Sequence, residues 1–135
     1  MTIDERLREF DYGAWSGLSN EEITRLSGEA ALRRWQEESV RPPGITFLPD
    51  EAAVRRESEE LLAELSRHEG ISIVISSNGR LREIGKLISG QAHQAFKVRT
   101  GGACVLELSE GSWSILGWDL QVEELRRFLD GNPPE

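Results

Sequence analysis

The sequence is poor in the residues that build disulfides, metal sites and proton-transfer sites. Its 135 residues include one cysteine, Cys104, and two histidines, His68 and His93. A single cysteine excludes an internal disulfide and a multi-cysteine zinc site, and we expect Cys104 to be a small core residue. We expect His68 at a helix end and His93 in a polar loop. No residue spacing matches a metal site, so the sequence predicts neither a metal nor a cofactor.

Positive charge and long apolar runs are also scarce. The chain has 16 Lys and Arg residues against 24 Asp and Glu residues, which gives a net charge of −8. We do not expect such an acidic chain to bind nucleic acid or anionic lipid. No apolar run reaches about 18 residues, and the N-terminal residues lack a signal-peptide pattern. The sequence therefore predicts no membrane association and a cytoplasmic location.

Length and pattern predict one α/β domain over residues 1–135, because domains commonly have about 100–200 residues. Capping signals and apolar spacing predict helices that start near residues 20, 29, 51, 80 and 121. Residues 71–76 are apolar or β-branched at nearly every position, which predicts a strand buried on both faces of a parallel sheet. Residues 103–108 and 113–116 predict a hairpin joined by a turn at 109–112.

A polar turn directly after the predicted buried strand is the clearest candidate site. It consists of Ser76, Ser77, Asn78, Gly79 and Arg80. Ligands of open α/β sheets bind beyond the carboxyl ends of strands, and a helix N-terminus with hydroxyl and guanidinium donors suits a small phosphate-type anion. The alternative is a plain helix cap in which Gly79 relieves backbone strain. Glu9 is a second candidate, either as a general acid or as one solvated carboxylate among many.

Residues 7–18, LREFDYGAWSGL, closely resemble a motif of the histidine phosphatase superfamily, the phosphoglycerate mutase-like proteins. The family pattern is approximately L-x-E-x-x-x-G-x-W-E-G. Further similarities follow in the family's order: Trp35 with residues 42–44, the stretch 74–84 beside the family's VVSHGGxIRxL, and the closing hairpin. This resemblance covers nearly the whole chain. It implies a reduced phosphoglycerate mutase-like sheet with flanking helices.

The sequence departs from the family at the residues that perform the family's chemistry. The resemblance places an R-H-G strand, whose histidine is phosphorylated, and a second phosphate-binding arginine upstream of residue 7. It therefore implies a truncated domain without the first strand. The family's general acid falls on Glu9, but its second histidine falls on Ser77. Ser77 cannot take a cationic role, and a serine nucleophile needs an adjacent base.

Three hypotheses about function follow from these departures. We favour a degenerate histidine phosphatase-like protein that has no phosphatase activity alone and acts as a binding or assembly module. The second is a phosphatase or phosphomutase-type enzyme, completed by another chain or using a non-histidine nucleophile. The third is a piece of a larger protein. Without its neighbour, the strand at 71–76 has an open apolar edge, so we expect a homo-oligomer or a partner chain to cover that edge.

Overall fold

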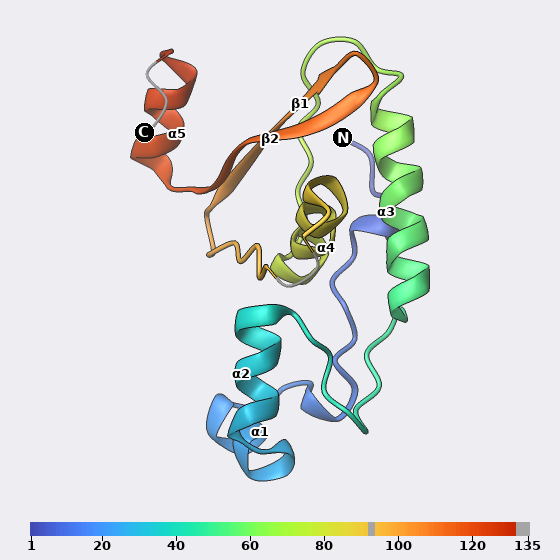
Figure 1. Cartoon of the computed structure of the whole chain (residues 1–135), viewed down its shortest axis with the longest axis vertical. Coiled ribbons are helices and arrows are strands. Elements are labelled where there is room, and N and C mark those ends of the chain that lie inside the picture. The colour runs from blue at the N-terminus through green and yellow to red at the C-terminus, as the bar shows by residue number, and fades with distance from the viewer. Residues whose placement is uncertain (92–93, 132–135) are drawn as a thin grey trace.

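The computed structural model describes residues 1–91 and 94–131, and these form a mixed α/β structure (Figure 1). The described part contains two short 3-10 helices, five α-helices and one two-stranded sheet. The α-helices are α1 (Asn20–Ser27), α2 (Glu29–Glu38), α3 (Glu51–Leu65), α4 (Asn78–Ser89) and α5 (Val122–Leu129). The strands are β1 (Ala103–Ser109) and β2 (Ser112–Leu120). Within the described ranges, no helix has the length and apolar character needed to cross a bilayer.

Local capping signals position the helices as the sequence predicts. The Ser19 side chain accepts a hydrogen bond from the backbone N–H of Glu22 at the start of α1. Asp50 does the same for Ala53 at the start of α3, and α5 opens with a capping box. These bonds satisfy N–H groups that the first turn of a helix leaves free. The predicted helices are confirmed, although α3 ends at Leu65 rather than near residue 70.

The predicted hairpin is also confirmed. β1 and β2 pair antiparallel, with Ser109 opposite Ser112, and β2 extends to Leu120 rather than ending at 116. Glu110 and Gly111 form the turn with φ values of 51° and 79°. A two-residue hairpin loop needs such left-handed conformations at both positions, and glycine adopts them without strain.

The predicted buried strand at residues 71–76 is wrong for this chain. The segment is not part of a sheet, and Ile71, Ile73 and Ile75 are 94%, 87% and 80% exposed. No backbone hydrogen bond joins these six residues to another segment of the described chain. A strand forms only beside another strand, and the hairpin is the one paired sheet in these ranges. Residues 71–76 therefore have a strand-like sequence but no neighbouring strand in the described residues with which to form a sheet.

Two hydrophobic clusters hold the described chain together. Trp15, Ile23 and Phe47 form the first, at the end of the molecule that holds α1 and α2. Leu61, Leu62 and Ile84 form the second, between α3 and α4, and the hairpin packs against it. Figure 1 shows α4 between the two ends and α5 set apart beyond the hairpin. The start of α4 is thus close to both the N-terminal segment and the rest of the fold.

Candidate functional site

The structure brings Glu9 close to the start of α4 through Tyr12. The Tyr12 hydroxyl donates to Oε1 of Glu9 over 3.4 Å. The same hydroxyl lies 2.9 Å from the point where a Cβ on Gly79 would stand. Burial, together with the nearby Glu9 carboxylate, raises the pKa of Tyr12 to about 12. Tyr12 therefore remains a protonated donor at neutral pH, placed between the carboxylate and the first turn of α4.

Gly79 is required by close packing rather than by backbone strain. Its φ is not in the left-handed region, so the sequence-based reason for a glycine here is wrong. A Cβ at Gly79 would approach the Phe10 ring to within 3.0 Å as well as the Tyr12 hydroxyl. The missing side chain lets the N-terminal segment lie directly against α4.

The polar side chains of Ser76 and Asn78 bond to the protein's own backbone. The Ser76 hydroxyl donates to the carbonyl of Leu7 over 2.8 Å. The Asn78 side-chain oxygen accepts from the backbone N–H of Val98, also at 2.8 Å. Both contacts tie distant segments to the start of α4. We therefore interpret Ser76 and Asn78 as structural residues that hold the turn against other segments of the chain.

Arg80 is likewise engaged within the protein. Its side chain is 3% exposed, with Nε donating to the carbonyl of Arg8 over 2.7 Å and Nη1 to Glu57 over 2.6 Å. The guanidinium also lies 5.2 Å from the centre of the Phe10 ring. These contacts join α3, α4 and the N-terminal segment, and they leave Arg80 directed inward rather than toward a ligand.

Ser77 differs from its neighbours because its hydroxyl is buried and has no hydrogen-bond partner among the described residues. The residue has an N-cap backbone conformation, yet its side chain does not cap α4. Leaving a buried hydroxyl unpaired costs about 1–3 kcal/mol. Within the polar turn, Ser77 is thus the side chain with donor capacity still unused, next to free N–H groups of the first helical turn.

Two further arginines lie near this region, one buried (Arg82) and one half-buried (Arg41), and the sequence did not point to either. Arg82 is 2% exposed and donates to the carbonyls of Trp35 and Gln36 at the end of α2. Arg41 donates to the carbonyls of Phe47 and Pro49. The carbonyl end of a helix attracts cations, which explains why Arg82 reaches α2. No local sequence signal marks Arg82 as buried, because the residues three and four positions away are Asn78, Gly79, Gly85 and Lys86.

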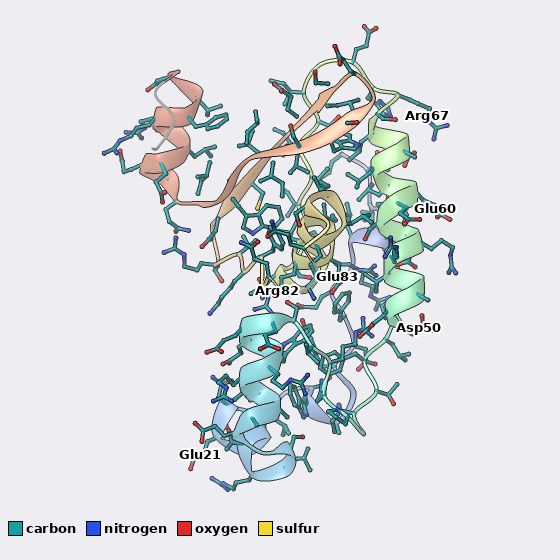
Figure 2. The ribbon with its side chains drawn as sticks, viewed as in Figure 1. Glu21, Asp50, Glu60, Arg67, Arg82 and Glu83 are labelled. Atoms are coloured by element: carbon teal, nitrogen blue, oxygen red, sulfur yellow. The ribbon has the colours of Figure 1, made fainter. Side chains whose placement is uncertain are left out.

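Glu83 follows Arg82 at the junction between α2 and α4, where Figure 2 labels both residues. Burial raises the pKa of the Glu83 carboxyl, while Lys86 and Arg41 act in the opposite direction. Burial also lowers the pKa of Arg82, which the Tyr12 hydroxyl and Glu83 partly offset. This junction therefore holds charged groups away from water.

The remaining sequence candidates do not join the site. His68 lies just after α3, where its backbone N–H donates to the carbonyl of Leu65, and His93 falls outside the described residues. Cys104 is half-buried on β1, and burial raises the pKa of its thiol, which is consistent with a small core residue. The described residues contain no cluster of three possible metal ligands.

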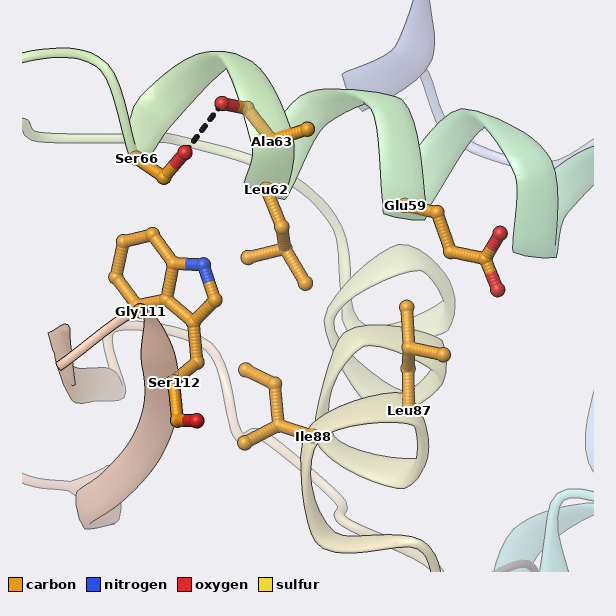
Figure 3. Close-up of a pocket in the computed structure, with 9 residues that line it drawn as sticks. Glu59, Leu62, Ala63, Ser66, Leu87, Ile88, Gly111 and Ser112 are labelled. Carbon is orange, nitrogen blue, oxygen red and sulfur yellow. Dashed lines mark hydrogen bonds between the residues drawn. The ribbon is translucent and has the colours of Figure 1, made fainter. Parts of the chain in front are cut away.

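A shallow groove lies away from these residues, between α3, α4 and the hairpin turn (Figure 3). Leu62, Leu87, Ile88 and Trp113 give it an apolar wall, and Glu59 stands at one end. The Glu59 carboxylate accepts a hydrogen bond from Arg55. Neither Glu9 nor Ser77 lines this groove, so it adds nothing to the candidate site.

The chain is similar to known proteins in both sequence pattern and fold. The family model described as the histidine phosphatase superfamily (branch 1) matches residues 1–121, so the chain belongs to this superfamily. No curated protein matches the chain. Among solved structures, a mycobacterial glucosyl-3-phosphoglycerate phosphatase is similar with a TM-score of 0.68 and 19% identity, over 88% of this chain and 65% of that one.

A second solved structure, titled mycobacterial hydrolase 1, has a TM-score of 0.66 and 19% identity. The match covers 88% of this chain and 64% of that chain. At this level of identity the similarity shows the fold. The chain spans just under two thirds of both solved structures, and the predicted α/β fold of this superfamily is confirmed over the matched part.

Proposed function

We propose that the chain is a catalytically inactive histidine phosphatase-like protein that acts as a binding or assembly module. The observation that supports this most directly is the state of Ser77. It stands where the resemblance places the family's second histidine, and no base contacts its hydroxyl in the described structure. Transfer of a phosphoryl group needs a strong nucleophile and a cationic pocket. Arg80, the cation of the turn, is already paired with Glu57.

The module retains one feature suited to a small phosphate-type anion. The Ser77 hydroxyl and the first-turn N–H groups of α4 offer donors at the positive end of a helix dipole. Inorganic phosphate at millimolar concentration is expected to raise the melting temperature of the wild type and not of Ser77→Ala. Ser112→Ala, an exposed change in the hairpin, serves as the matched control. An equal shift in all three proteins would contradict binding at Ser77.

Catalysis is the second candidate function, and the position of Glu9 favours it. Through Tyr12, this carboxylate reaches the start of α4, which is where a proton donor to a bound phosphate ester would be useful. Such an enzyme would require another chain that supplies the nucleophile, or a nucleophile other than histidine. Ser77 would be the first residue to test.

Hydrolysis of p-nitrophenyl phosphate from about pH 4 to 9 separates these two functions. We expect no turnover by the purified wild type or by Glu9→Ala prepared identically. Turnover by the wild type that Glu9→Ala abolishes would contradict the inactive assignment. Turnover of equal size in both preparations would indicate a contaminating phosphatase, and a second purification scheme would remove it.

Assembly is supported by a different part of the molecule. Residues 71–76 expose isoleucine side chains and unpaired backbone directly before the polar turn. An extended segment of this kind accepts another strand by β-addition. We therefore propose that a second chain covers this segment, with the cytoplasmic location and the single domain over residues 1–135 kept as predictions from the sequence.

A further inference from the structure

We propose that residues 7–12 form a gate over Ser77, and that a phosphate-type anion reaches the Ser77 hydroxyl only when this segment lifts from the start of α4. This inference rests on the proposed anion-binding function and adds how that site is regulated. Its starting point is the burial of the hydroxyl, which has no hydrogen-bond partner among the described residues. A phosphate oxygen must come within about 2.5–3.0 Å of a hydroxyl oxygen to bond with it. A buried hydroxyl offers no room for this approach, so binding requires a movement.

Two hydrogen bonds hold residues 7–12 across the polar turn. The Ser76 hydroxyl donates to the carbonyl of Leu7 over 2.8 Å. Nε of Arg80 donates to the carbonyl of Arg8 over 2.7 Å. Because these bonds lie on both sides of residue 77 in the sequence, the segment runs over the whole first turn of α4.

Aromatic side chains of the same segment press on the turn between these bonds. The Phe10 ring and the Tyr12 hydroxyl lie so close to Gly79 that a Cβ there would come within 3.0 Å of the ring and 2.9 Å of the hydroxyl. Ser77 lies within this run of contacts. We therefore assign the cover of its hydroxyl to residues 7–12.

The attachment of this segment to α4 consists of side-chain contacts. No backbone hydrogen bond joins residues 1–48 to the described residues after 49. The segment bonds instead to the loop before α3, where Asp11 and Leu48 exchange two backbone hydrogen bonds of 2.8 Å. The Tyr12 ring also packs on Phe47, with ring centres 5.0 Å apart. The segment can thus lift from α4 together with this loop, and no helix or strand is broken.

The binding of an anion to the open form alone has a measurable consequence. The apparent dissociation constant then equals the intrinsic one divided by the fraction of open molecules. Gly79→Ala places a methyl group against Phe10 and Tyr12 and so favours the open form. We expect inorganic phosphate to bind Gly79→Ala at least about threefold more tightly than the wild type, although the variant is less stable.

Gly85→Ala is the matched control on the same helix. A Cβ at Gly85 would stand 2.7 Å from Cγ of the Phe96 ring, so this change crowds a different segment. That segment touches the polar turn from elsewhere, because the backbone N–H of Val98 donates to the Asn78 side chain. We expect a comparable loss of melting temperature and no gain in phosphate affinity.

Cysteine labelling measures the opening without any ligand. In a Cys104→Ala background, Ser77→Cys places a thiol at the covered position, and Thr100→Cys supplies an exposed reference. A disulfide reagent should label Ser77→Cys at least about tenfold more slowly than Thr100→Cys, since only the open minority reacts. Low urea concentrations should change this rate little, because a local opening exposes far less surface than global unfolding. Adding Gly79→Ala should accelerate the labelling, and adding Gly85→Ala should not.

The combined results decide the proposal. Slow labelling of Ser77→Cys that Gly79→Ala alone accelerates, with tighter phosphate binding by Gly79→Ala, supports the gate. Labelling as fast as that of Thr100→Cys, or with the urea dependence of global unfolding, overturns it, and both readings hold even where Gly79→Ala does not fold. Equal effects of Gly79→Ala and Gly85→Ala, or an unchanged phosphate affinity in Gly79→Ala, also overturn it. Phosphate that binds no variant would instead overturn the proposed anion site, whatever the labelling shows of the movement.

Discussion

The segments on the two sides of Ser77 reverse the usual distribution of polar and apolar residues. Before it, Ile71, Ile73 and Ile75 are mostly exposed, and after it Arg80 and Arg82 are 3% and 2% exposed. Isoleucine is among the residues most often buried, and arginine among those least often buried unless paired. Burial in this chain therefore depends on the packing and hydrogen-bond contacts available to each segment, and not on residue type alone.

The buried arginines have such partners. Arg82 donates to two carbonyls and to the Ser39 hydroxyl, and its guanidinium lies 5.3 Å from the centre of the Trp35 ring. Arg80 has a carboxylate, a carbonyl and an aromatic ring. A buried charge is tolerated when hydrogen bonds replace its water. The isoleucines find no corresponding sheet neighbour in the described chain.

Among substitutions at the buried arginines and exposed isoleucines, Arg82→Ala is expected to have the largest effect on stability. The change leaves the carbonyls of Trp35 and Gln36 without their donor and removes three of the hydrogen bonds between α4 and the end of α2. We expect a loss of about 3 kcal/mol in the free energy of unfolding, which urea denaturation measures.

Arg55→Ala is the control for this change. Arg55 is 72% exposed and pairs with Glu59 on the surface of α3, where such pairs contribute about 0.2–1 kcal/mol. Similar losses for the two variants would show that Arg82 does not hold the junction between the helices.

A smaller effect, dependent on pH, is expected for Glu83→Gln. Burial raises the pKa of Glu83 above its ordinary value of 4.5, so the protonated carboxyl favours the folded state. That contribution is complete below pH 4.5 and is lost as the pH rises through the folded-state pKa. Glu83→Gln should therefore gain stability relative to the wild type as the pH rises from 4 to 8.

Urea denaturation across this range measures the difference between the two proteins, so titrations common to both cancel. Glu60→Gln, an exposed change on α3, should follow the wild-type curve (Figure 2). A Glu83→Gln curve that runs parallel to the wild type would show that the Glu83 carboxyl is not desolvated in the folded protein.

Features set by local interactions were the ones that could be predicted from the sequence. Ser19, Asp50 and the turn at Glu110 and Gly111 each determine an element through bonds within a few residues. The strand at 71–76 could not be judged in this way, because strand formation depends on a distant neighbour. The motif at residues 7–18 led to the correct family, since its pattern is specific.

The sequence predicted the local structure around the candidate residues, but not how their side chains bond. The sequence predicted that residues 76–80 form a polar turn at a helix start, and Glu9 lies close by through Tyr12. The bonds of Asn78 and Arg80 reach Val98 and Glu57, which are remote in sequence. Side-chain type alone does not reveal whether a donor faces a ligand or another part of the chain.

The smallest expected effect concerns the exposed isoleucines that precede Ser77. Ile73→Ala should change the free energy of unfolding by less than about 0.5 kcal/mol in dilute protein, because Ile73 is exposed. Ile84→Ala is the matched control: Ile84 is 6% exposed in the cluster between α3 and α4, and such truncations cost about 2–5 kcal/mol. The same substitution is therefore expected to cost little stability at Ile73 and much more at Ile84. A loss of several kcal/mol for Ile73→Ala in dilute protein would mean that the segment is already covered within one chain, and the open edge proposed for assembly would not exist.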